Sequence, residues 1–265
     1  MAGMIDIRNV TWKRDGKTIL DDVSWQVEKG EHWAVLGLNG SGKTTLLNMI
    51  NGYIWPTQGE MTVLGRKFGQ TDMRELRKNI GWVSSSLKAR IHGTDDAQEV
   101  IASGKYASIG LYEVPDERDF ERVFSLMDQL GIRHLIGRSY ATCSQGEQQK
   151  ILIARGLMAE PELLILDEPT NGLDFISREE LMNAIKHLAG SEQAPVLVLV
   201  THHTEEILPA FSHTLLLREG RVFDQGSNRD MLTSDKLSDF FQRPVAVDWV
   251  KDRAWLRLGE ENLDN

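Results

Sequence analysis

The segment HWAVLGLNGSGKTTLLNMING, residues 32–52, runs from an apolar stretch through a glycine-rich loop into a stretch with helical spacing. Within it, GLNGSGKT (37–44) fits the pattern G-x-x-x-x-G-K-[ST], a phosphate-binding loop when a strand precedes it and a helix follows it. We predict the strand over 32–37, and the spacing and final glycine of TLLNMING predict the helix. The glycines do not give G-x-G-x-x-G, which disfavours a dinucleotide site.

This loop binds phosphate through its backbone and two side chains. Its glycines let several N–H groups point inward, and the following helix adds the positive end of its dipole. Lys43 is expected to contact the β and γ phosphates, and the Thr44 hydroxyl is expected to bind Mg²⁺. The residues predicted to contact the nucleotide here are Gly37, Leu38, Asn39, Gly40, Ser41, Gly42, Lys43, Thr44 and Thr45.

A second motif, LLILDEPTNGLD (163–174), is a continuous apolar run that ends in two adjacent carboxylates. Such runs are typical of strands buried on both faces of a parallel sheet. The carboxyl end of a strand is where an α/β sheet binds ligands. Asp167 can therefore hold Mg²⁺ through water, and Glu168 is placed to orient or deprotonate a water that attacks the γ phosphate.

A third motif, VLVLVTHH (196–203), is another buried strand that ends in polar residues. His202 or His203 could donate a hydrogen bond to the γ phosphate or to the attacking water. A histidine after a strand is more often a surface residue, so the motif alone is weak. A paired-histidine metal site lacks a third ligand at suitable spacing.

The composition limits the cellular setting. The 265 residues are 41% hydrophobic, enough for a proper core, and the net charge of −9 disfavours general nucleic-acid binding. A single cysteine excludes an intrachain disulfide, no apolar run approaches the ~20 residues that span a bilayer, and the first ten residues show no signal peptide. We expect a cytoplasmic protein that reaches the membrane only through a partner.

The remaining pattern predicts an α/β fold with a helical insertion. We expect a P-loop NTPase core with a mostly parallel sheet, an N-terminal antiparallel β subdomain and an inserted helical subdomain. The predicted divisions are 1–85 (β subdomain and P-loop part of the core), 86–157 (helical subdomain), 158–226 (the rest of the core) and 227–265 (a C-terminal helical tail).

Together these motifs resemble the ATP-binding subunits of ABC transporters, over about residues 5–226. GLNGSGKT matches the Walker A motif, LLILDE matches Walker B, NGLD (171–174) looks like the D-loop, and His202 looks like the switch histidine. The resemblance implies that the nucleotide is ATP with Mg²⁺, and that the catalytic residues are Glu168, His202 and Lys43.

The turn CSQGE (143–147) resembles the signature motif of that family, usually written LSGGQ. The resemblance implies a head-to-tail dimer in which Ser144, Gln145, Gly146 and Glu147 of one subunit cap the γ phosphate held by the other. A polar turn at a helix N-terminus suits an anion. The alternative is an ordinary helix N-cap, which explains the serine but not the position of the turn just before the Walker B strand.

Two positions depart from the family pattern. Ser85 falls where the family places a glutamine that reaches Mg²⁺ and the transmembrane partner, and serine is too short to do this directly. The aromatic residue that stacks on adenine would fall near Arg14, and the nearest aromatic is Trp12 on the same strand face. Trp12 could stack on adenine or belong to the core, and the Arg14 guanidinium could stack instead.

The leading hypothesis is an ATPase subunit, working as a homodimer with transmembrane permease subunits. AQEVIASG (97–104) resembles the stretch that opens the helical subdomain in importers of metal chelates and of oxyanions such as molybdate. The resemblance implies an importer-like lineage but does not identify the cargo. The alternative is a soluble ABC-type ATPase that regulates a cytosolic protein or a nucleic acid without a permease. A module that binds but does not hydrolyse nucleotide is disfavoured, because Glu168 and His202 are both present.

Overall fold

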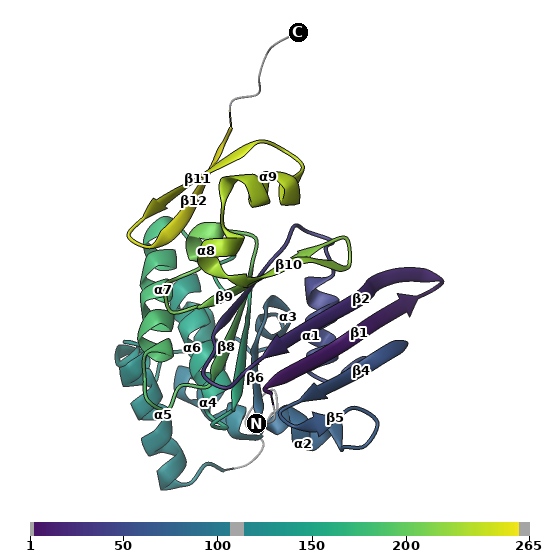
Figure 1. The fold of residues 1–265 in the computed structure, drawn as a ribbon. Helices are drawn as coiled ribbons and strands as arrows, with labels where there is room; N and C mark the ends of the chain where they lie inside the picture. Colours follow the sequence, from purple (N-terminus) through teal and green to yellow (C-terminus); the bar gives the residue numbers. More distant parts are fainter. Residues whose placement is uncertain (1–2, 107–113, 260–265) are drawn as a thin grey trace. The chain divides into compact units, whose positions relative to one another are not determined.

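The computed structural model describes residues 3–106 and 114–259, except for the side chains of Ser85 and Ser86. The chain divides into two compact units, which are described one at a time. The first unit holds the described residues up to Leu76 and those from Val198 onward, and the second unit is Arg77–Leu197. Figure 1 shows the path of the chain through the elements of each unit.

An antiparallel sheet forms the N-terminal part of the first unit, as predicted. Its strand order is β2-β1-β4-β5. Val23, Trp25 and Val27 are buried on one face of β2, the alternation expected of a strand with one face in the core. The strands are β1 (Ile5–Arg14), β2 (Lys17–Val27), β4 (Gln58–Val63) and β5 (Arg66–Lys67).

The first unit also contains a mainly parallel sheet. The order is β10-β9-β3-β8, in which β3 runs parallel to both β8 and β9, and β10 pairs with β9 as an antiparallel hairpin through Glu219 and Gly220. The apolar runs of β3 and β8 are buried throughout, as the absence of alternation predicted. The elements are β3 (Trp33–Leu36), α1 (Lys43–Ile50), β8 (Val196–Thr201, whose last four residues belong to this unit), η4 (Thr204–Glu206), β9 (His213–Arg218) and β10 (Arg221–Ser227).

The C-terminal segment corrects the prediction of a helical tail over 227–265. Two short helices, α8 (Asn228–Met231) and α9 (Ser234–Phe241), are followed by a hairpin of β11 (Val245–Val250) and β12 (Arg253–Leu258). Lys251 and Asp252 form its two-residue turn, both with positive φ, 49° and 58°. Positive φ at both central residues matches the twist of the strands. Neither residue is glycine or asparagine, so the usual sequence signal for such a turn is missing.

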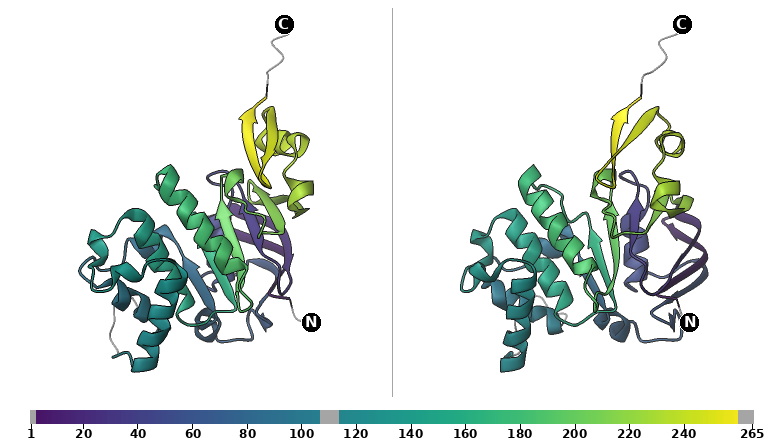
Figure 2. Two further views of the ribbon diagram at one scale, coloured as in Figure 1. Left: turned by 90° about the vertical axis from the view of Figure 1, so that its left-hand side faces the viewer. Right: turned by 60° about the vertical axis from the view of Figure 1, so that its left-hand side comes forward.

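The second unit is mostly helical around two parallel strands. β6 (Ile80–Val83) pairs with β7 (Leu163–Asp167), and both are largely buried. Figure 2 shows α4, α5 and α6 gathered together in teal, and these helices contact one another. The mainly helical character predicted for this region is confirmed, while the predicted subdomain limits remain predictions. The helices are α2 (Met73–Lys78, which begins in the first unit), α3 (Ser85–Lys88), α4 (Ala97–Ala102), η1 (Ser103–Tyr106), α5 (Glu117–Gln129), η2 (Arg133–Leu135), η3 (Tyr140–Thr142), α6 (Gln145–Leu157) and α7 (Phe175–Ala189).

No helix within residues 3–106 and 114–259 combines the length and the apolar character needed to cross a membrane.

Candidate functional site

The phosphate loop joins β3 to α1, the arrangement that its motif requires. Gly40 and Gly42 have φ values of 81° and 104°, which residues with a β-carbon rarely adopt. A β-carbon on Gly37 would lie 2.6 Å from the carbonyl oxygen of Leu217 and 2.5 Å from the Ser41 Oγ. The loop therefore needs glycine at Gly37 to fit against β9, and at Gly40 and Gly42 to turn.

Lys43 is buried at the first position of α1, with only 6% of its surface exposed. Its Nζ donates hydrogen bonds to the carbonyl oxygens of Gly37, at 2.7 Å, and Leu38, at 3.2 Å. These bonds hold the ammonium group inside the curve of the loop. A phosphate bound there would meet a positive charge that is already placed.

The N-terminus of α1 is free to bind an anion. Gly42 occupies the N-cap position, and no side chain among the described residues caps the helix there. The first N–H groups of a helix have no partner within the helix, so an uncapped start offers several donors together with the helix dipole. Thr44 is exposed and Thr45 is half-buried in this first turn. The loop thus has the donors, charge and curvature that a triphosphate needs.

A small cavity of about 190 Å³ lies against the outer part of the loop. Leu38, Asn39, Gly40 and Ser41 line one side, and residues 217–219 at the end of β9 and 240–242 at the end of α9 line the rest. Within the described residues the buried Ser41 Oγ has no hydrogen-bond partner. The C-terminal segment of the first unit therefore reaches the edge of the phosphate loop.

Trp12 is half-buried on β1 and pairs with Leu20 of β2. The Leu20 side chain lies close to the phosphate loop, because a β-carbon on Gly42 would be 2.8 Å from the Leu20 Cδ2. Arg14 is exposed, and its Nε lies 3.6 Å from an Asp15 carboxylate oxygen. Stacking of adenine on Trp12 remains a prediction, as does the alternative stacking on Arg14.

In the second unit, Asp167 ends β7 and Glu168 follows it, both half-buried. Glu168 has a φ of 48°, an unusual value for a residue with a side chain. The turn continues with a hydrogen bond from the Asn171 N–H to the Glu168 carbonyl oxygen, at 3.2 Å. Such a backbone conformation costs free energy and persists only where the surrounding fold enforces it. Residues that adopt it cluster at functional sites.

His202 and His203 follow β8 in the first unit, both half-buried. Their rings lie against each other, with centroids 4.1 Å apart and planes tilted by 38°. Thr201, before them, is buried, and Glu206, after them, is buried in η4. The turn that carries the two histidines is thus enclosed at both ends.

The turn CSQGE forms the N-terminus of α6. Ser144 is the N-cap, and its Oγ accepts a hydrogen bond from the Glu147 N–H at 3.3 Å. In return, the Ser144 N–H donates to the Glu147 carboxylate at 2.7 Å, which completes a capping box. Ser144 and Gln145 are exposed, and the Ser144 hydroxyl keeps its own proton for another acceptor.

Gly146 packs against the segment that follows the D-loop. A β-carbon on Gly146 would lie 3.2 Å from the Ser177 Cβ of α7. Ser177 in turn is bound to the N-cap of α7, since its N–H and its hydroxyl both donate to Asp174, at 3.0 and 2.7 Å. The signature turn and the NGLD segment are therefore packed together within the second unit.

Two residues that the motif search missed fix the charge of Glu147. His134 Nε2 lies 3.1 Å from one Glu147 carboxylate oxygen, and Arg138 lies 3.7 Å from it. Burial alone would raise the pKa of Glu147. The hydrogen bonds from Ser144 and His134 and the charge of Arg138 outweigh it and hold this pKa below its usual range. These partners come from η2 and the loop after it, and no local pattern predicts them.

We expect Glu147→Ala to lower the free energy of unfolding by about 1 kcal/mol at pH 7, because it removes the capping box. Since the pKa of Glu147 is lowered by folding, its stabilisation is present above the ordinary carboxyl value of about 4.3 and is lost as the pH falls below it. Urea unfolding of both proteins at pH 7 and at about pH 3 measures this. Glu147→Gln, which can still accept the Ser144 N–H, is the control. An equal difference between Glu147→Ala and the unsubstituted protein at both pH values would contradict the interpretation.

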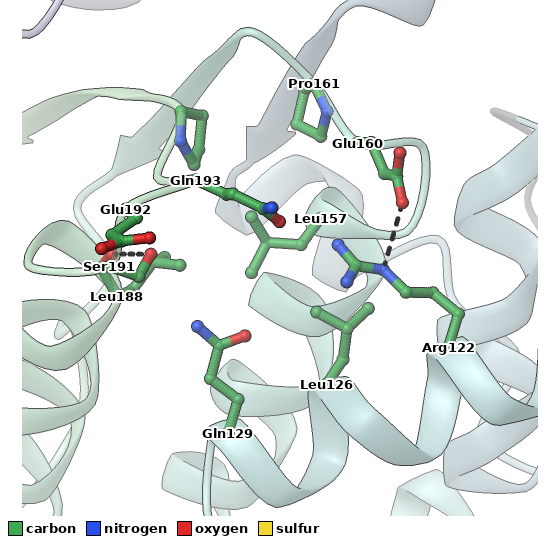
Figure 3. A pocket seen from close by; sticks show the side chains of 11 residues that line it. Arg122, Leu126, Gln129, Leu157, Glu160, Pro161, Leu188, Ser191, Glu192 and Gln193 are labelled. Carbon is green, nitrogen blue, oxygen red and sulfur yellow. Dashed lines mark hydrogen bonds and ion pairs between the residues drawn. The ribbon is translucent and has the colours of Figure 1, made fainter.

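Two further features bear on the site. The side chain of Ser85, at the start of α3, lies outside the described residues, so its role stays open. A larger cavity of about 510 Å³ lies in the second unit, and none of its lining residues is a predicted site residue. Figure 3 shows its polar rim, where Arg122 points to Glu160 with 3.7 Å between the Arg122 Nε and the nearer oxygen. This larger cavity is therefore separate from the predicted nucleotide site.

Known proteins are similar to this chain over most of its length. The protein family described as ABC transporter matches residues 20–171. YlmA of Bacillus subtilis, an uncharacterized ABC transporter ATP-binding protein, is 51% identical over 258 residues, which cover 97% of this chain and 98% of YlmA. A structure described as a metal-chelate type ABC transporter in an inward-facing conformation has a TM-score of 0.79 and 26% identity, and covers 99% of this chain and 100% of that one. A dimeric ATP-binding cassette with ADP and Pi has a TM-score of 0.71 and 26% identity, and covers 84% of this chain and 98% of its own.

Proposed function

We propose a function from the premise that this chain belongs to the ABC transporter family of ATP-binding proteins. It is the ATPase subunit of a membrane transporter with an importer-like lineage. Members of this family bind nucleotide and hydrolyse ATP, and this chain is an ATPase of that family. The observation that carries the proposal is the phosphate loop, where the buried Lys43 ammonium group and the uncapped start of α1 occur together.

Each catalytic role follows from chemistry that the described residues can perform. Lys43 stabilises the negative charge that develops on the phosphates during hydrolysis. Glu168 orients and deprotonates the attacking water from a turn in which its backbone has a positive φ. His202 donates a hydrogen bond toward the γ phosphate. Trp12 offers an aromatic face to the adenine.

The oxygen donors suit Mg²⁺, which prefers hydroxyl, carboxylate and water ligands. Thr44 would hold the ion through its hydroxyl, and Asp167 would hold it through water. When bound, Mg²⁺ neutralises part of the phosphate charge. Ser85 stands where the family usually has a longer glutamine, so a contact from Ser85 to the ion would need a bridging water.

Dimer formation is the second half of the proposal. Ser144 and Gln145 are exposed at the start of α6, and a polar turn at a helix N-terminus suits the γ phosphate held by a second copy of the chain. ATP would then join two subunits, and loss of the γ phosphate would remove the contacts that hold them together. The solved dimeric cassette with ADP and Pi supports this proposal by similarity.

A soluble regulator without a permease is the second candidate. The observation in its favour is Ser85, because the missing glutamine usually links the nucleotide site to the transmembrane partner. Such a protein would use the same ATP-driven closure to grip a cytosolic protein or a nucleic acid. The net charge of −9 makes a nucleic-acid partner less favourable.

Affinity purification from membranes separates the two candidates. We expect the tagged protein to be peripheral on the cytoplasmic face and to bring a protein with many membrane spans with it. Recovery only from the soluble fraction, with a soluble partner and no polytopic one, would contradict the transporter hypothesis in favour of the regulator.

A further inference from the structure

The turn that carries His202 is held together by an internal hydrogen-bond network. The Thr201 hydroxyl donates to the Glu206 carboxylate at 2.5 Å, and the His203 N–H donates to the Thr201 Oγ1 at 3.0 Å. Thr201 and Glu206 are each only 1% exposed. The two ends of the turn are therefore tied to each other in a place from which water is excluded, where hydrogen bonds are strong.

The middle of the same turn is bound from the C-terminal hairpin. The Arg253 Nε donates to the backbone carbonyl oxygen of Glu205 at 2.6 Å, a short bond with a charged donor. Strand β12, which begins at Arg253, packs along η4, and the neighbouring Ala254 is fully buried. Glu205 lies three residues after His202, so this contact acts on the backbone that sets the direction of the imidazole.

The hairpin itself is firmly attached within the first unit (Figure 1). At its turn, Arg229 of α8 contacts Asp252 at 2.7 Å and lies over the Trp249 ring at 4.0 Å. At α9, the Ser238 hydroxyl donates to the Val245 carbonyl oxygen at 3.1 Å, and the Val245 N–H donates to the Ser238 Oγ at 3.0 Å. The hairpin that carries Arg253 is therefore held in place by its contacts with α8 and α9.

We propose that Arg253 is a positioning residue for ATP hydrolysis and that the hairpin of β11 and β12 serves as a clamp on the turn of His202. The inference rests on the proposed role of His202 toward the γ phosphate. The clamp holds the Glu205 carbonyl in place, which fixes the backbone between it and Thr201 and so the aim of the His202 ring. Without the clamp, Thr201 and Glu206 still close the turn, but its middle can shift.

The test uses variants of the full chain that separate the hydrogen bond from the packing. Arg253→Met keeps an apolar stem beside the Trp255 ring but has no donor, and Arg253→Lys keeps a positively charged donor group. Arg257→Met is the matched control, because Arg257 is on the same strand and its Nε donates to the exposed Asp248 carboxylate at 2.8 Å. ATP hydrolysis, ATP binding and Tm are measured for each, with and without His202→Ala.

We expect Arg253→Met to lower kcat by about tenfold to a hundredfold, because a misplacement of about 1 Å in an active site can cost about 10²-fold. KM for ATP should change by less than about threefold, Arg253→Lys should recover much of the activity, and Arg257→Met should have none of these effects. In the His202→Ala background, Arg253→Met should have almost no further effect, because a residue that acts only through His202 cannot lose more.

Two results would overturn the inference while leaving the proposed function intact. One is an unchanged kcat in Arg253→Met although His202→Ala lowers kcat. The other is an Arg253→Met effect that multiplies with that of His202→Ala, which would indicate a general loss of structure. Full activity of His202→Ala would instead overturn the role of the histidine itself, and the clamp with it. If Arg253→Met fails to fold, Arg253→Gln, which keeps a polar side chain but has no charged donor, carries the same comparison.

Discussion

Lys43→Ala is expected to abolish detectable ATP binding and to lower ATP hydrolysis by about 10²- to 10³-fold, which corresponds to a loss of roughly 3–4 kcal/mol of transition-state stabilisation. The substitution removes the buried ammonium group and also the bonds by which it holds the carbonyl groups of Gly37 and Leu38. The loop would lose both its charge and its internal tie. Binding of a fluorescent ATP analogue and release of phosphate measure the two effects.

Lys17→Ala is the control for this change, because Lys17 is an exposed lysine on β2 of the same unit. It should leave binding and hydrolysis unchanged. Circular dichroism should show that both variants are folded, since the helix α1 has other buried residues that hold it in place. If Lys43→Ala bound ATP as tightly as the unsubstituted protein, GLNGSGKT would not be the phosphate loop.

Glu168→Gln is expected to lower turnover by about 10²- to 10⁴-fold while ATP affinity is retained. The amide has the same shape and can adopt the same positive φ, so the backbone of the turn should not change. It cannot accept the proton of the attacking water. Unhydrolysed ATP should then hold two copies of the chain together, so size-exclusion chromatography in ATP should show a species of twice the mass.

Glu162→Gln provides the matched comparison, since Glu162 is exposed just before the other end of β7. That variant should hydrolyse ATP normally and should form no lasting dimer. Wild-type turnover in Glu168→Gln would remove Glu168 from the mechanism. A Glu168→Gln protein that binds ATP but stays monomeric would keep the residue in the chemistry and contradict the proposed dimer.

The phosphate loop, the Walker B strand and the strand before His202 were predictable because each depends on local pattern. A continuous apolar run predicts a strand buried on both faces, and β3, β7 and β8 are such strands. The glycine spacing of the loop predicts its curve for the same reason, because φ is a property of single residues. These features need no knowledge of distant contacts.

The missed features depend on contacts between distant residues or on weak turn signals. Arg253 and Glu205 are 48 positions apart, and nothing near either residue in the sequence marks the bond between them. The C-terminal hairpin was mistaken for helix because its turn uses Lys251 and Asp252 in place of glycine or asparagine. Likewise, the partners of Glu147 become visible only once η2 and the following loop are folded beside α6.

The single cysteine gives the signature turn a chemical label of its own. Cys143 is buried immediately before Ser144, and burial together with the charge of Glu147 raises the pKa of its thiol. The thiolate is the form that attacks an alkylating reagent, so Cys143 should react slowly while α6 keeps its first turn. Since the sequence has no second cysteine, the rate of alkylation reports the opening of this one turn, in the natural protein and without any engineering.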